Sequence, residues 1–203
     1  MYSFYVFEGS FHQGGGGWED IEVSHSLPAI QEAAVDYIRL GNWAGATDDF
    51  LVRAYQAGQL AVEKDLYPFL QVKVPGLTTI SFRNDGKPQG GEPEPGSEYE
   101  EERSDYEADE WIEFFLTNVF QSVAEEEADE IEVTIDWARL ALPELSQPLL
   151  PDEKVVFVRQ VEGNERAWGE ALAVDGDIDP DDDLEEQFGY GRHLTCGYNS
   201  LFL

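Results

Sequence analysis

The chain has 203 residues, of which 43 are acidic and 12 are basic, and its formal net charge is −31 at pH 7. Anionic lipid and nucleic acid would repel such a surface, so we expect it to bind neither a membrane nor nucleic acid directly. The chain also contains 12 Phe, 9 Tyr and 5 Trp residues. Disordered acidic chains are poor in aromatic residues, so a folded core is expected here.

The first 82 residues predict an α+β N-terminal part. Ser26 and Pro28 suit the start of a helix. Gly14 to Gly17 lack the Gly-Lys-Ser/Thr ending of a phosphate-binding loop and indicate a surface loop instead. The elements predicted there are, in chain order, a strand at 2–8, the glycine loop, a helix at 26–41, a second helix from Thr47, and strands at 66–74 and 77–82 around a Pro-Gly turn.

Residues 83–104 are rich in glycine and proline and carry six glutamates. A stretch of this length without regular structure is unusual inside a compact domain, and such stretches tend to be functional loops or linkers. We therefore expect an acidic loop or linker between two halves of the chain.

Residues 105–203 predict an acidic α+β C-terminal part. Ser104 and Glu107 match a capping box, and the helix predicted at 105–124 has a broad apolar arc. The later predicted elements are a strand at 130–137 and a hairpin of residues 155–161 with 167–174. Together these elements predict an α+β fold with a mixed or antiparallel sheet and about three helices. Whether 105–203 forms one domain with 1–82 stays open.

The charge is concentrated in the second half. Residues 1–91 hold 11 acidic and 6 basic residues, and residues 92–203 hold 32 acidic and 6 basic residues. Unbalanced charge of this size repels itself in the compact state and attracts cations, basic proteins or salt. Asp105, Asp109 and Glu113 are spaced to share one side of a helix, and Glu130, Glu132 and Asp136 to share one face of a strand.

We expect these carboxylates to face the basic groove of a partner protein. The candidate partner-binding residues are Glu98, Glu100, Glu101, Glu102, Asp105, Asp109, Glu113, Glu125, Glu126, Glu127, Asp129, Glu130 and Glu132. Tyr99 and Tyr106 lie beside them and are candidate aromatic anchors.

Three other interpretations compete with a partner surface. Acidic residues at a helix start are favoured by the helix dipole, which accounts for about four of them. A salt-adapted host favours acidic, lysine-poor surfaces, although that bias should then cover the whole chain. A candidate calcium loop places acids at positions 1, 3, 5, 7, 9 and 12 of an EF-hand-like pattern, but proline stands at its sixth position, where glycine is required. Its ligands would be Asp175, Asp177, Asp179, Asp181 and Glu186.

No catalytic motif accompanies the charge, so a binding protein without a cofactor is expected rather than an enzyme. Cys196 is the single cysteine, which excludes an internal disulfide. The start of the chain lacks the basic segment of a signal peptide, and no run approaches the ~18 apolar residues of a membrane span, so we expect a cytoplasmic protein.

In charge and size the chain resembles the DNA-mimic inhibitors, which include antirestriction and some anti-CRISPR proteins, and the acidic immunity proteins that block basic nucleases. The resemblance carries over no functional residue, because it rests on composition and not on a motif. It implies a basic nuclease or another nucleic-acid-binding effector as the partner. A homodimer remains open.

Overall fold

The computed structural model describes residues 3–9, 21–41, 50–57, 59–146, 154–162, 165–174 and 193–198. The chain forms two compact units. Unit 1 comprises residues 1–33, 51–64 and 142–203, and unit 2 comprises residues 34–50 and 65–141. The candidate calcium loop and the glycine loop lie outside the described residues.

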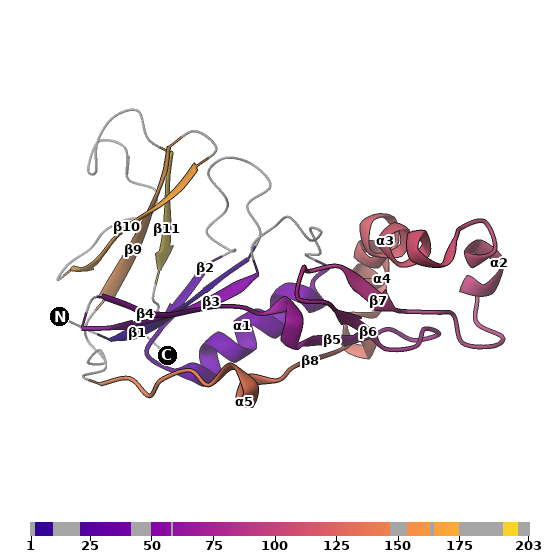
Figure 1. Ribbon diagram of the computed structural model, residues 1–203, viewed down its shortest axis with the longest axis horizontal. Helices are drawn as coiled ribbons and strands as arrows, with labels where there is room; N and C mark the ends of the chain where they lie inside the picture. The colour runs from indigo at the N-terminus through magenta and orange to yellow at the C-terminus, as the bar shows by residue number, and fades with distance from the viewer. Residues whose placement is uncertain are drawn as a thin grey trace. The chain divides into compact units, whose positions relative to one another are not determined.

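Unit 1 contains a four-stranded sheet in the order β2-β1-β3-β4 (Figure 1). Its strands are β1 (Phe4–Glu8), β2 (Ile21–Ser24), β3 (Leu51–Gln56) and β4 (Gln59–Asp65). β1 pairs antiparallel with both β2 and β3. All five β1 side chains are buried, so both faces of this strand are covered. The predicted strand at 2–8 is thus confirmed in its described part.

A second sheet of unit 1 has the order β10-β9-β11. Its strands are β9 (Lys154–Glu162), β10 (Glu165–Val174) and β11 (His193–Tyr198). β9 and β10 form an antiparallel hairpin in which Glu162 is opposite Glu165. This confirms the predicted hairpin.

The helix predicted at 26–41 is confirmed as α1 (Leu27–Arg39). Its buried residues Ile30, Ala34, Tyr37 and Ile38 follow the helical repeat. The second helix predicted from Thr47 is wrong beyond residue 50, because β3 begins at Leu51. The β3 backbone pairs with β1 over its first five residues, and this pairing outweighs the helix-start signal before it.

Unit 2 contains a four-stranded antiparallel sheet in the order β7-β6-β5-β8. Its strands are β5 (Leu70–Lys73), β6 (Ile80–Phe82), β7 (Pro88–Gly90) and β8 (Glu132–Ile135). The expected pairing around the Pro-Gly turn is present, since Val72 is opposite Ile80 and Gly76 has a φ of 76°. A 3₁₀ turn, η2 (Tyr67–Phe69), takes the place of the first residues of the predicted strand.

The helices of unit 2 lie mostly between β7 and β8 in the sequence. They are α2 (Tyr99–Arg103), α3 (Ala108–Asn118), α4 (Phe120–Glu127), the 3₁₀ turn η3 (Ala128–Glu130) and α5 (Trp137–Leu140). The largest fully buried side chain is Trp111 of α3, whose indole Nε1 donates to the Gly91 carbonyl at 2.9 Å. Every described strand pairing is antiparallel, so the predicted α+β class is confirmed.

One expectation for unit 2 is corrected, and one region contains regular structure that was not predicted. Within residues 83–104, β7 pairs with β6 and α2 follows. The capping box is wrong. Ser104 follows α2 and its hydroxyl donates to the Glu101 carbonyl at 2.6 Å, while Glu107 is the N-cap of α3 and makes no side-chain cap hydrogen bond.

Candidate functional site

The acidic residues before α3 are fixed by a buried tyrosine. Tyr99 is only 8 % exposed, and its ring meets Phe115 edge-on at 5.4 Å between centroids. This contact anchors α2, and the glutamates around Tyr99 are exposed. They are Glu98, Glu100, Glu101 and Glu102. Tyr99 is therefore a core residue, and its expected role as a partner-facing anchor is wrong.

The predicted long helix is two helices. Val119 has a φ of −115° and separates α3 from α4. The rings of Phe115 and Phe120, on either side of the break, are both buried with centroids 6.4 Å apart. A continuous helix would place these two residues about 140° apart around the axis, and the break brings both rings into one core.

The helical row of three acids does not form. Asp105 lies in the turn before α3, so it is outside the helix that was to align it with Glu113. Glu113 is exposed on α3, and the side chain of Asp109 lies outside the described part. The strand row is also shorter than predicted, because Glu130 belongs to η3 and Asp136 accepts a cap hydrogen bond from the Arg139 backbone N–H at 3.3 Å.

A second group of acids follows α4. Phe120 and Ala124 are the buried residues of this helix, and Ile131 and Ile135 are buried around β8. Burial of these four residues leaves the carboxylates between them in solvent. The exposed residues are Glu125, Glu126, Glu127, Asp129, Glu130 and Glu132.

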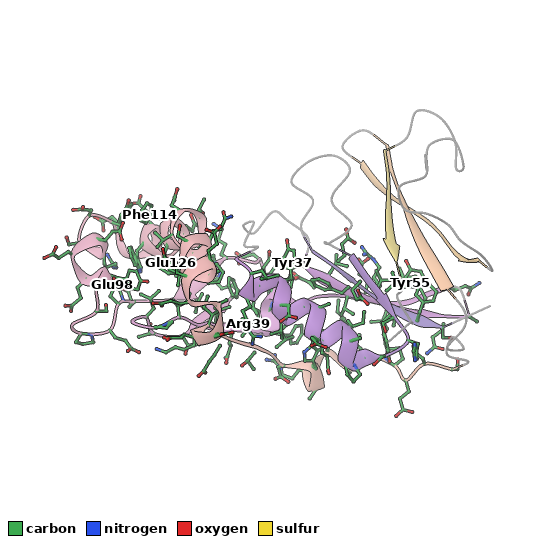
Figure 2. The ribbon with its side chains drawn as sticks, turned by 180° about the vertical axis from the view of Figure 1, so that it is seen from behind. Tyr37, Arg39, Tyr55, Glu98, Phe114 and Glu126 are labelled. Carbon is green, nitrogen blue, oxygen red and sulfur yellow. The ribbon has the colours of Figure 1, made fainter. Side chains whose placement is uncertain are left out.

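The two groups converge. Burial raises the pKa of Tyr99, and the charges of Glu98, Glu127 and Glu102 raise it further. Glu98 immediately precedes α2 and Glu102 lies within it, whereas Glu127 ends α4, so carboxylates far apart in sequence lie near one tyrosine. Figure 2 shows Glu98 beside α2 and Glu126 on α4, both in unit 2. We call the exposed carboxylates of α2, α4, η3 and β8 the acidic surface.

The acidic surface has little internal neutralisation. Residues 92–132, which include this surface, hold seventeen acidic residues and one basic residue, Arg103. Outside the surface, Glu94 pairs with Lys73 at 2.5 Å. Arg103 pairs with Glu92 at 2.9 Å and donates to the Tyr106 carbonyl at 2.6 Å. Within the described residues, none of the sequence-predicted partner residues takes part in an ion pair. Their charge is therefore available to a partner.

One partly exposed aromatic residue of this region was not predicted as part of the candidate site. Phe114 stacks on Tyr106 with ring centroids 4.3 Å apart and planes 22° apart, and both side chains are partly exposed. Its position in the helical repeat could have predicted this exposure, because Phe114 lies at the edge of the buried arc of α3 and not at its centre. Aromatic residues are enriched in protein interfaces.

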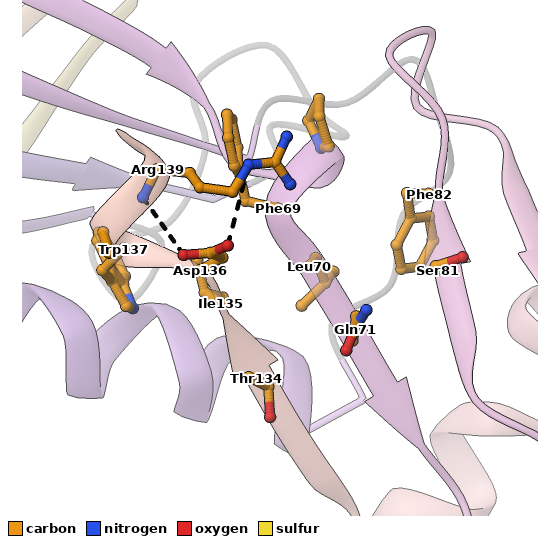
Figure 3. A pocket seen from close by; sticks show the side chains of 12 residues that line it. Phe69, Leu70, Gln71, Ser81, Phe82, Thr134, Ile135, Asp136, Trp137 and Arg139 are labelled. Carbon is orange, nitrogen blue, oxygen red and sulfur yellow. Dashed lines mark hydrogen bonds and ion pairs between the residues drawn. The ribbon is translucent and has the colours of Figure 1, made fainter. Parts of the chain in front are cut away.

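Unit 2 also has a hollow of about 520 Å³ on the β6-β5-β8 face of its sheet (Figure 3). Gln71 is opposite both Ser81 and Thr134 in register. At one end the Arg139 guanidinium lies 5.2 Å from the centre of the Phe69 ring and 3.9 Å from Asp136. Arg139, the cation among the described residues that line this hollow, thus has an aromatic and a carboxylate neighbour within the protein.

Metal binding has no support in the described part of the chain, where no three His, Cys, Asp or Glu side chains form a group able to hold an ion. None of the described helices combines the length and apolar character needed to cross a membrane. Comparison of the chain with protein-family models, curated proteins and solved structures finds no match.

Proposed function

We propose that this chain is a binding protein whose acidic surface occupies the nucleic-acid groove of a basic protein and excludes DNA or RNA from it. The observation that carries the proposal is that the exposed, unpaired carboxylates of α2 and α4 surround one aromatic core. In that core the rings of Tyr99 and Phe115 are 5.4 Å apart and those of Phe115 and Phe120 are 6.4 Å apart between centroids. The partner class is a nuclease or another nucleic-acid-binding effector met in the cytoplasm, and no catalytic step is assigned to this chain.

The spacing of the charges supports this use. Helix neighbours three and four residues apart have Cβ atoms about 5–6 Å apart. A groove lined with Lys and Arg for phosphates can therefore pair with several carboxylates of this surface at once. Arginine is the better partner, because its fork donates two parallel hydrogen bonds to one carboxylate.

Exposure limits what each pair contributes. Solvent-exposed ion pairs contribute about 0.2–1 kcal/mol each, so affinity must come from many pairs and from contacts around them. The larger electrostatic effect is on association, because a one-signed field steers an oppositely charged partner and loses this effect as salt rises. A complex built in this way binds fast at low salt and weakens with ionic strength.

Competition with DNA tests the proposal. The immobilised chain captures proteins from a lysate at low salt, a salt gradient elutes them, and each eluted protein is then titrated with labelled duplex DNA. We expect this chain to displace the DNA, with an affinity that falls steeply as salt rises. Absence of competition at about 50 mM salt would contradict the proposal.

Charge removal locates the surface. We expect Glu125→Gln, Glu126→Gln and Glu127→Gln together to slow association roughly tenfold at low salt. The control is Glu32→Gln, Asp36→Asn and Asp85→Asn, which removes the same formal charge outside the acidic surface. It takes one acid that has no ion pair among the described residues and two acids that are ion-paired with Arg39 and Arg83. If the two triple variants associate at the same rate, net charge and not this surface drives binding.

A further inference from the structure

The Tyr106–Phe114 pair is a partly exposed aromatic stack inside an otherwise buried cluster. Trp111 is fully buried and its ring centroid lies 6.2 Å from both Tyr106 and Phe114. Phe115, the next residue on α3, is also fully buried. The stack is thus the solvent-facing edge of the aromatic core of unit 2, and Figure 2 shows Phe114 on α3.

Hydrogen bonds of Arg103 and Trp111 fix the position of the stack. The Arg103 guanidinium donates to the Tyr106 carbonyl at 2.6 Å, and its Nε bonds Glu92 at 2.9 Å. The Trp111 indole is fixed by its hydrogen bond to the Gly91 carbonyl. Arg103 is committed to these partners, and no cation of the described residues lies over either ring of the stack. The exposed ring surface therefore has a fixed orientation and no internal cation.

Carboxylates surround the stack. Asp105 and Glu107 flank Tyr106 in the sequence, and Glu110 precedes Phe114 by one helical turn, which makes the two side chains neighbours on α3. All three acids are exposed, and none forms an ion pair with another described residue. A cation placed over the rings can therefore also reach a carboxylate.

We propose that the Tyr106–Phe114 stack is the docking point for one arginine side chain of the basic partner. This inference rests on the proposed function and adds a specificity that charge alone does not give. A planar guanidinium stacks on an aromatic face while its N–H groups bond a carboxylate in the same plane. A lysine ammonium is a compact, strongly hydrated point charge and gains less from such a site. The stack therefore selects arginine over lysine.

Two labelled peptides of equal charge test this selection, one of nine arginines and one of nine lysines, by fluorescence anisotropy at about 0.1 M salt. We expect the wild type to prefer the arginine peptide, and Tyr106→Leu or Phe114→Leu to reduce that preference by roughly two- to fivefold. Tyr106→Phe keeps the ring and is expected to keep the preference. Glu110→Gln removes charge and is expected to weaken both peptides.

The outcomes separate the two proposals. No binding of either peptide overturns the proposed function. Binding of both, with an arginine preference that Tyr106→Leu leaves unchanged, overturns the docking point and leaves the acidic surface intact. If the leucine variants do not fold, an NMR measurement on the wild-type complex tests the docking point instead. Ring currents should then shift the side-chain proton resonances of the bound arginine peptide upfield, and an unshifted spectrum overturns the docking point.

Discussion

Arg53 and Glu8 form an ion pair inside unit 1, where their side chains are 2 % and 0 % exposed. Glu63 adds a second carboxylate at 2.6 Å from the arginine Nε. Transfer of such charges out of water costs several kcal/mol per ion, and only close pairing with further hydrogen bonds offsets that cost. The carboxylates of the acidic surface avoid the cost by staying in water. They can therefore stay unpaired in the absence of a partner, whereas the buried Glu8 carboxylate requires its ion pair.

Glu22 is the residue through which pH should act on unit 1. It lies on β2 opposite Phe7, and burial raises the pKa of its carboxyl group from 4.5 to about 7. Between these two values the folded state keeps a proton that the unfolded state has released, so stability falls as pH rises through this window. We expect Glu22→Gln to be more stable than the wild type above the window, by on the order of 1 kcal/mol because partial exposure screens the effect.

Urea unfolding at about pH 5 and about pH 8 measures this difference. The gain in unfolding free energy of Glu22→Gln should be larger at the higher pH. Glu32→Gln, at an exposed position of α1, is the control and should change little at either pH. If the difference in unfolding free energy between Glu22→Gln and the wild type is the same at both pH values, other groups cause the pH response.

At the scale of elements, local patterns were reliable where one strand or helix buries one face. The alternation of Ile131, Val133 and Ile135 predicted β8, and the 3.6-residue repeat predicted α1. Local sequence patterns did not predict features that depend on contacts between residues distant in the sequence. The break at Val119 follows from the packing of Phe115 and Phe120 in one core, and β7 exists because it pairs with β6. Nothing within residues 83–104 alone specifies that pairing.

The candidate site shows the same division. The sequence placed most of the acidic residues correctly in solvent, because charged side chains are seldom buried. It could not tell that Tyr99 is buried and Tyr106 partly exposed, since both tyrosines stand among glutamates. It also could not show that α2 and α4 share one surface. Those facts depend on contacts between residues distant in sequence.

The contact between α3 and the residue that follows β7 gives a prediction at the scale of elements. Gly91 has a φ of 70°, and a Cβ atom there would lie 2.3 Å from the Ile112 Cδ1 atom. Gly91→Ala therefore adds a steric clash in the core to a strained backbone, and we expect it to destabilise the fold by about 2–4 kcal/mol. Gly96→Ala is the matched control, because its φ is 85° and nothing lies within 4 Å of the added atom.

Thermal unfolding compares the two glycine variants. Gly96→Ala carries only the strain of a left-handed residue, about 1–2 kcal/mol, and should lower the melting temperature less. Equal losses for both variants would mean that α3 does not pack against the Gly91 backbone as closely as described.

For the whole molecule, charge and aromatic burial act against each other. A net charge of −31 favours expansion through self-repulsion. In unit 2 the opposing contribution comes from the rings around Trp111, because large aromatic side chains bury much apolar surface and their pairs add about 0.5–1.5 kcal/mol each. Aromatic burial in unit 2 thus opposes the self-repulsion of the acidic chain.

This balance fixes how salt should act on the molecule. At about 0.1 M salt the Debye length is about 10 Å, and at about 1 M it is about 3 Å, so added salt screens the repulsion. We expect circular dichroism to show a cooperative fold at about 0.1 M KCl and a modest rise in melting temperature towards about 2 M. A salt-adapted protein would instead be unfolded at the lower concentration. Salt should therefore raise the melting temperature of the chain and lower its affinity for a basic partner. These opposite changes would distinguish a partner-binding surface from a surface adapted to high salt.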